Sequence, residues 1–195
     1  MGLTEIKKEL KKLDKNKLIE IVADLYKKNT SVKEFFDFYI NPEEKELFNK
    51  YREKVYAAFF PKHGFNYSLK DGKKAISDFK KLGASAEFLA DLMLFYVETG
   101  VKFTIDYGDI NETFYNSLAT TFKASLTLME KENVLPKFET RVDKIIDDTK
   151  QMGWGFHDYL LQTSYDFYPP EIDENFEENQ IETEEKGKII KLNRH

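Results

Sequence analysis

Apolar residues recur at intervals of three and four along almost the whole chain, and this spacing limits the possible folds more than any other feature. In the first segment, Leu3, Ile6 and Leu10 share one face of an amphipathic helix. No segment alternates polar and apolar residues with the period of two that a half-buried strand requires. The sequence therefore predicts an all-α protein of eight or nine helices in stacked antiparallel pairs. These pairs would form either an irregular α-solenoid or a compact multi-helix bundle.

Capping residues divide this pattern into segments. Asp14 and Ser68 are expected to cap helices, and Ser31 opens a capping box with the acid three residues later. Asn41 precedes a proline at a first helical position, which is a strong start signal. Gly108 is expected to end the longest helix. These signals predict helix boundaries that agree with the apolar spacing.

The segment from Phe88 to Val97 is the most apolar in the chain and carries a single charge, Asp91. A helix that is apolar nearly all round is normally covered on several sides, so we expect this helix to be central. Glu98 shares a helix face with Asp91, two turns along. Asp91 is therefore expected to be a structural acid that bonds to a neighbouring helix; the alternative is that it marks a groove.

The composition agrees with long helices around a core filled by rings: 17 Phe and 11 Tyr stand against 9 Gly and 5 Pro. The chain contains no cysteine, which excludes disulfides, thiolate metal ligands and cysteine catalysis and suits a reducing compartment. The absence of a long apolar run predicts no membrane segment and a cytoplasmic protein. We expect one helical domain over residues 1–168 and a flexible, acidic tail over residues 169–195.

The stretch from Gly153 to Asp158 is the first candidate site. Glycines flank Trp154, the only tryptophan, and Phe156 and His157 follow. Such a backbone is expected to turn sharply and to present particular side chains. His157 and Asp158, together with Asp147 and Asp148, could bind a divalent metal or carry protons. The structural alternatives are a satisfied histidine and an acid that favours the first turn of a helix.

The loop Asp106-Tyr107-Gly108-Asp109 is the second candidate site, because paired carboxylates can bind a metal or act as acid and base. The commoner role is capping, and we expect Asp109 to cap the next helix, with Asn111 as the alternative. Asp106 has less structural reason to be there, since a carboxylate near a helix C-terminus faces an unfavourable dipole. The candidate metal ligands are thus Asp106, Asp109 and His157.

The run from Phe95 to Thr104, the following Asp106–Ile110 segment, the Ala75–Gly83 stretch and the Gly153–Asp158 stretch resemble a bacterial family of uncharacterised helical proteins. The N-terminal Glu-Leu-Lys-Lys-Leu segment is similar to that family as well. The resemblance covers roughly residues 3–168. It implies a helical domain of unknown function, with no activity, cofactor or site residue attached.

No phosphate-binding glycine loop, nucleophile elbow or zinc-finger spacing is present in the sequence. The leading interpretation is a protein-interaction module without a cofactor. Its aromatic groove would lie near residues 106–109 and 153–158 and take a protein partner. One alternative is a metal-assisted hydrolase that uses Asp106, Asp109, His157 and Asp158. The other is a weak nucleic-acid binder that uses the lysine-rich N-terminal hairpin, although the net charge of −5 disfavours nucleic acid. A homodimer through an exposed ring patch is a further possibility.

Overall fold

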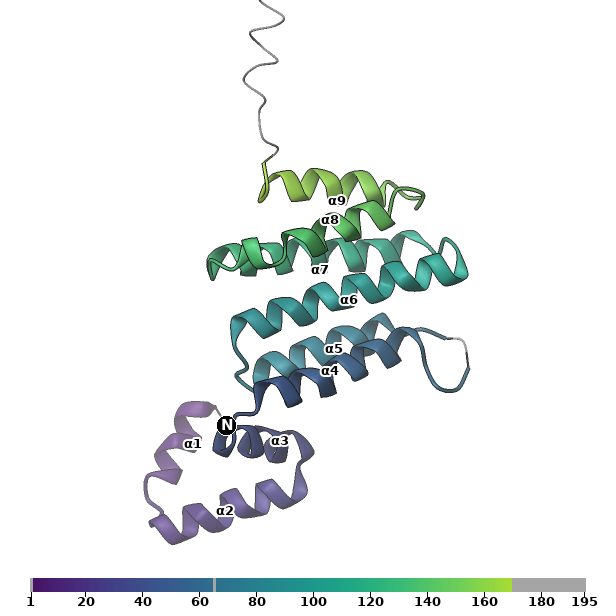
Figure 1. Ribbon diagram of the computed structural model, residues 1–195. Coiled ribbons are helices and arrows are strands. Elements are labelled where there is room, and N and C mark those ends of the chain that lie inside the picture. Colours follow the sequence, from purple (N-terminus) through teal and green to yellow (C-terminus); the bar gives the residue numbers. More distant parts are fainter. Residues whose placement is uncertain (1, 65, 170–195) are drawn as a thin grey trace, which may run out of the picture.

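The computed structural model describes residues 2–64 and 66–169, and these residues form an all-α fold with no strand among them (Figure 1). The helices are α1 (Leu3–Leu10), α2 (Lys15–Lys28), α3 (Thr30–Ile40), α4 (Glu44–Phe59), α5 (Leu69–Lys81), α6 (Ala86–Tyr107), α7 (Glu112–Lys131), α8 (Glu139–Asp148) and α9 (Phe156–Tyr165), with a short 3₁₀ turn at Leu135–Lys137 before α8. The all-α prediction is therefore confirmed. Of the predicted tail, all but Pro169 lies outside the described residues.

The capping predictions are partly confirmed. Asp14 accepts a hydrogen bond from Lys17 N at 2.9 Å, and Ser68 Oγ accepts one from Asp71 N at 3.2 Å. The predicted capping box at Ser31 is wrong, because Asn29 caps α3 and the helix begins one residue before Ser31. The prediction that Asn41 caps α4 is also wrong, since α4 begins at Glu44 without a side-chain cap. Each error shifts a helix start by two residues and leaves the helix order unchanged.

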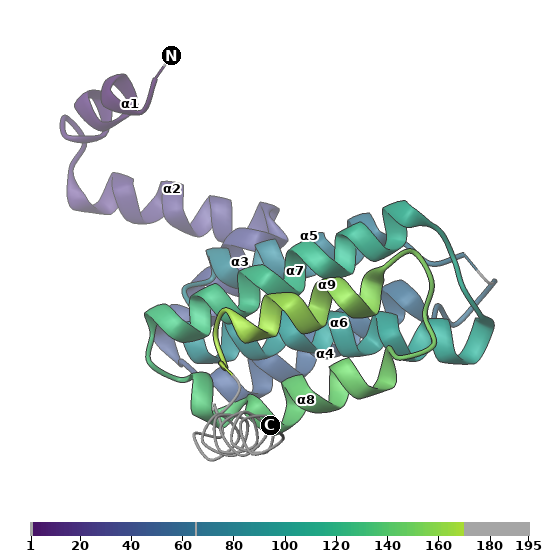
Figure 2. The ribbon, with the colours of Figure 1, turned by 90° about the horizontal axis from the view of Figure 1, so that it is seen from above.

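Helices α4 to α9 form the body of the protein (residues 44–168), in which antiparallel helices stack as successive layers (Figures 1 and 2). Helix α6 is the central helix, as predicted, and it packs against α4 and α5 on one side and against α7 and α8 on the other. Leu92, Leu94 and Val97 of α6 are completely buried. A Cβ added to Gly100 would lie 2.4 Å from Leu118 Cδ2, so the close approach of α6 and α7 depends on this glycine.

Aromatic rings fill the centre of the body. The ring of Phe59 lies 5.0 Å from that of Tyr96 and 6.0 Å from that of Phe114, and all three residues are essentially buried. The Tyr96 hydroxyl is 2.8 Å from Ser117 Oγ, so this buried polar group has a partner. The predicted ring-filled core is confirmed.

Asp91 is a structural acid, as predicted. Arg141 of α8 donates to Asp91 Oδ1 at 2.7 Å and to Glu98 through two nitrogens at 2.8 and 2.9 Å. Burial lowers the pKa of the Arg141 guanidinium, but the bonds to Glu98 and Asp91 raise it by more. The three charges therefore fasten α8 to the central helix.

Helices α1 to α3 form an arm (residues 2–40) that projects from the body (Figures 1 and 2). None of its described residues is buried. The arm meets the body at Glu34, which accepts hydrogen bonds from Lys50 Nζ at 2.7 Å and from the Tyr51 hydroxyl at 3.0 Å. Phe38 is half-buried against the edge of the core.

Among the described residues, no helix is both long and apolar enough to cross a membrane.

Candidate functional site

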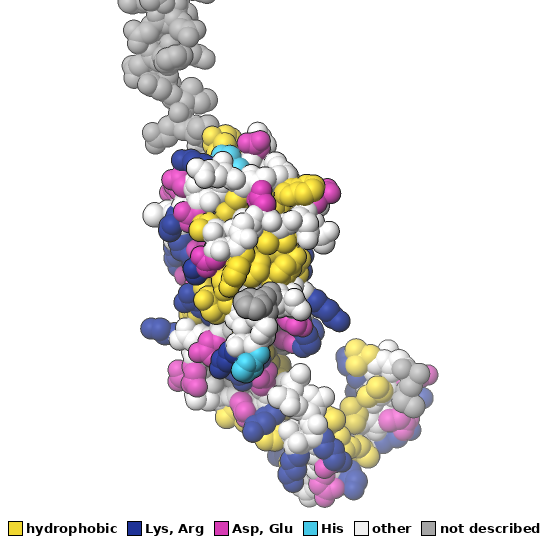
Figure 3. Space-filling model, turned by 90° about the vertical axis from the view of Figure 1, so that its right-hand side faces the viewer, with side chains coloured by type: hydrophobic (Ala, Val, Ile, Leu, Met, Phe, Trp, Pro, Cys, Tyr) yellow, Lys and Arg dark blue, Asp and Glu magenta, His cyan; other side chains and the backbone are white. Residues whose placement is uncertain are grey.

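Three connections lie together at one end of the body: the α4–α5, α6–α7 and α8–α9 loops (Figure 1, right). We call this region the loop end. It contains both segments that the sequence singled out, residues 106–109 and residues 153–158. Figure 3 views the loop end directly and shows hydrophobic side chains gathered near the middle of this face.

Asp109 links the two segments. Its carboxylate accepts hydrogen bonds from Gly153 N at 3.2 Å and from the Tyr115 hydroxyl. These bonds, that of Tyr115 first, lower the pKa of Asp109, while burial and the bond to Asp109 raise the pKa of Tyr115 to about 12. The expected capping role of Asp109 is wrong. Asn111 caps α7 instead, accepting from Phe114 N at 3.0 Å, and this leaves Asp109 free to bridge two loops.

The Gly153–Gly155 segment makes a tight turn in which Trp154 and Gly155 both have positive φ values, of 60° and 64°. Trp154 is 62% exposed, whereas Phe156 is buried and its ring lies 4.9 Å from that of Tyr115. A side chain as large as tryptophan rarely adopts a left-handed conformation, and such strain is more frequent at functional positions. A Cβ on Gly153 would lie 2.7 Å from Asp109 Oδ2, so the contact between the loops requires glycine there.

The candidate metal ligands do not converge. Asp106 forms an ion pair with Lys102 at 2.8 Å, which offsets its unfavourable place near a helix C-terminus. His157 Nδ1 lies 3.1 Å from Thr149 Oγ1 and 3.2 Å from the Ile146 carbonyl, and Asp158 is exposed in the first turn of α9. Within residues 2–64 and 66–169, no group of three or more histidines and acids is placed to hold a metal ion. The geometry does not favour the metal-assisted hydrolase.

A pocket of about 560 Å³ lies between the α6–α7 loop and the α8–α9 connection. Its charged lining consists of Asp109, Asp147, Asp148 and Lys150. The acids are partly satisfied within the protein: Lys150 bonds to Asp147 at 2.7 Å and Lys144 to Asp148 at 2.8 Å. The bond from Lys150 lowers the pKa of Asp147, so this carboxylate is ionised at neutral pH. With three acids and one base, the pocket is suited to a positively charged group.

Rings gather beside this pocket rather than within it. Tyr107 is 58% exposed, and its ring lies 4.7 Å from that of Phe103 and 6.2 Å from that of Phe60. Tyr67 adds a ring 5.3 Å from Phe103. These four rings form an aromatic cluster at the loop end, which we call the ring patch (Phe60, Tyr67, Phe103 and Tyr107); Phe103 is its buried base and Tyr107 its exposed member.

Sequence reasoning missed part of this region. Phe60 and Tyr67 flank the α4–α5 loop, and only their position at a helix end hinted at the ring patch. Lys150 and Ile105 were also missed in the pocket lining. Asp147 and Asp148 were expected as metal ligands with His157; they line the pocket with Asp109, and the charge of His157 acts on Asp147.

The lysine-rich N-terminal hairpin lies in the arm, away from the loop end (Figure 1). Lys12 pairs with Glu9 at 2.7 Å and Lys17 with Glu20 at 3.1 Å. Because neighbouring acids neutralise these lysines, the geometry does not favour a nucleic-acid surface there.

Fold and site thus define an all-helical protein with a layered body and a projecting arm. A family model matches residues 1–168, and the chain belongs to this Family of unknown function (DUF6155). The expected membership of a helical family of unknown function is confirmed. A search of curated proteins and a search of solved structures found no match.

Proposed function

We propose that this protein is an interaction module that binds a segment of a partner protein at the loop end. The observation that carries the proposal is the meeting of exposed rings with an acid-lined pocket at one end of a rigid helical stack. Tyr107 and Trp154 are 58% and 62% exposed, and the pocket of about 560 Å³ lies between the loops that carry them. Exposed aromatic side chains of this kind are typical anchors of protein interfaces.

The chemistry of the surface specifies the partner. The ring patch accepts apolar or aromatic side chains, and Asp109, Asp147 and Asp148 accept a lysine or an arginine. The preferred ligand is therefore a segment in which a basic residue stands next to apolar ones. The absence of cysteine supports a cytoplasmic site of action, which we include in the proposal.

Display of random peptides against the immobilised full chain tests this proposal. We expect enriched sequences that combine lysine or arginine with neighbouring apolar residues. Trp154→Ala and Asp148→Lys should each weaken binding of an enriched peptide at least about tenfold, as expected for interface anchors. Tyr165→Ala is the matched control, because Tyr165 is an exposed ring of α9 outside the pocket lining and the ring patch.

Two outcomes would refute the proposal. One is the failure of any sequence to be enriched. The other is an enriched peptide that binds the Trp154→Ala and Asp148→Lys variants as tightly as it binds the unchanged chain.

A further inference from the structure

Helix α1 presents an apolar stripe that the rest of the chain does not cover. Leu3 is 68% exposed, Ile6 44% and Leu13 36%. Among the described elements, α1 packs extensively against no other helix. A helix of eight residues gains little stability by itself, so this stripe needs a surface to pack on.

A matching surface exists between α2 and α3. A groove of about 470 Å³ is lined by apolar side chains from these two helices. Its main lining residues are Leu18, Ile19, Val22, Tyr26, Phe36 and Ile40. No residue of the body contributes to the lining, and Ile19 and Ile40 are 54% and 77% exposed. The arm therefore contains both an uncovered apolar helix and an unfilled apolar groove.

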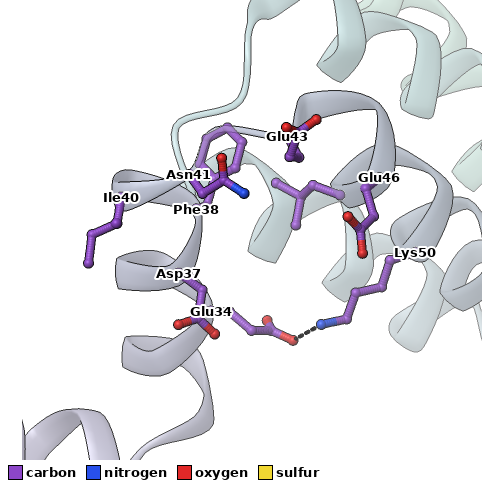
Figure 4. Close-up of a pocket in the computed structure, with 9 residues that line it drawn as sticks. Glu34, Asp37, Phe38, Ile40, Asn41, Glu43, Glu46 and Lys50 are labelled. Carbon is purple, nitrogen blue, oxygen red and sulfur yellow. Dashed lines mark hydrogen bonds and ion pairs between the residues drawn. The ribbon is translucent and has the colours of Figure 1, made fainter.

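The charges around the groove complement those of α1. A second groove, of about 460 Å³, lies between α3 and α4, and Asp37 and Ile40 line both grooves. Figure 4 shows its acids Glu34, Asp37, Glu43 and Glu46, with Lys50 as the one base, bound to Glu34. Helix α1 and the residue just after it carry Lys7, Lys8 and Lys11, while Lys12 is paired with Glu9. A basic amphipathic helix laid in the first groove would bring its lysines near the acids of the second.

We propose that two copies of this chain exchange α1, so that the α1 stripe of each copy fills the α2–α3 groove of the other. This contact is independent of the loop end and of the function proposed there. It is a reciprocal twofold contact, the commonest symmetry of protein dimers. Nine large apolar side chains of the arm are 36–77% exposed. Six of them belong to the two surfaces that would meet: Leu3, Ile6 and Leu13 in the stripe, and Ile19, Val22 and Ile40 in the groove.

The structure places α1 outside the groove of its own chain, which leaves that groove open to the second copy that we propose. Lys12 N bonds to the Glu9 carbonyl at 3.0 Å and Leu13 N to the Leu10 carbonyl at 3.1 Å, and Asp14 caps α2. These bonds fix the turns on either side of the link, and no residue of α1 lines the groove of its own chain. A membrane surface is a poorer occupant, because residues 2–40 hold seven acids beside nine lysines.

Light scattering on the full chain, with complementary variants, tests the exchange. The unchanged chain should be a dimer. Ile6→Asp damages the stripe and Ile19→Asp damages the groove, so each should raise the dimer dissociation constant at least about tenfold. Tyr165→Asp is the matched control in the body and should remain a dimer. The fluorescence of Trp154, the only tryptophan, reports whether the body stays folded in each variant.

Mixing the two variants distinguishes exchange from simple unfolding of the arm. An Ile6→Asp chain keeps an intact groove, and an Ile19→Asp chain keeps an intact stripe. The mixture should therefore recover a heterodimer held by one sound contact. A monomeric unchanged chain, a dimer insensitive to both substitutions, or a mixture that stays monomeric would each overturn the proposal.

Cross-linking determines which chain supplies α1. Because the sequence has no cysteine, an Ile6→Cys/Val22→Cys chain carries only two thiols. A short bismaleimide should join them into a covalent dimer. An internally cross-linked monomer would show closure within one chain, and unreacted thiols would show that another occupant, such as residues 170–195, covers the groove; either result contradicts the exchange.

Discussion

The body and the arm are built from the same kind of amphipathic helix, but only the body covers its apolar faces. In the body, α6 is enclosed by four other helices, and residues such as Leu94 are fully buried. In the arm, no described residue is buried, and Leu25 is 50% exposed. The family model spans both regions. This difference shows that helical periodicity identifies the apolar side of a helix but does not identify what covers that side.

The largest expected effect is the difference in stability between two leucine-to-alanine variants, one in the body and one in the arm. Leu94→Ala should lower the free energy of unfolding by about 3 kcal/mol, because it removes buried methyl groups and leaves a cavity in the core. Leu25→Ala should lower it by less than about 0.5 kcal/mol, since the side chain is half-exposed. Chemical denaturation followed through Trp154 fluorescence measures both values. Equal losses of unfolding free energy would contradict the distinction between a covered body and an uncovered arm.

The next effect concerns the ionic connection within the body. Arg141→Met should lower the free energy of unfolding by about 1–3 kcal/mol, because Asp91 and Glu98 lose their shared charged donor. Lys17→Met removes an exposed ion pair of the arm and should cost less than about 1 kcal/mol. Thermal and urea unfolding of the two variants provide the comparison. An Arg141→Met variant as stable as the unchanged chain would show that α8 is held by apolar packing alone.

A smaller effect is expected at the loop end. Gly153→Ala should cost about 1 kcal/mol of stability, because the new methyl group displaces the Asp109 carboxylate from the Gly153 amide. The loss of peptide-binding free energy should exceed this loss of stability, because the substitution separates the loops that frame the pocket. Gly2→Ala is the control, because Gly2 has an ordinary φ of −99° and a Cβ there would meet nothing within 4 Å. Unchanged peptide affinity in Gly153→Ala would remove the loop contact from the proposed site.

The smallest effect is a dependence on pH. The pKa of Asp109 is lowered in the folded chain, so its bonds stabilise the fold above the usual aspartate pKa of about 4. That contribution is lost as the pH falls through the lowered pKa of the folded state. Asp109→Asn should therefore be less stable than the unchanged chain at pH 7, and the gap should narrow in acid. Urea titrations at several pH values measure this difference in stability. A difference that stays constant with pH would contradict the proposed role of Asp109.

Most of the fold could be predicted from the sequence because helix formation is signalled locally. The apolar run around Leu92 identified the central helix, and Asp91 with Glu98 identified a structural charge site. The candidate site was only partly predictable. Asp109 was expected to cap a helix, but it bonds to Gly153, 44 residues away. Contacts over such separations depend on how the layers stack, and that information is absent from local spacing.

The exposure of the arm could not be predicted from the sequence either. Ile6 and Ile19 have the spacing of core residues, and only the structure shows that nothing within the described chain covers them. The same limit applies to the ring patch. Phe60 and Tyr67 lie at the ends of neighbouring helices, and their meeting with Phe103 depends on the α4–α6 contact.

Hydrogen exchange of the full chain at low and high protein concentration tests the contrast between body and arm most directly. The account predicts that amides of residues 2–40 exchange rapidly in dilute solution and become protected as the concentration rises. Amides of α6 should be protected at every concentration. Protection of the arm equal to that of α6 in the most dilute sample, or an arm that stays unprotected when concentrated, would contradict the account.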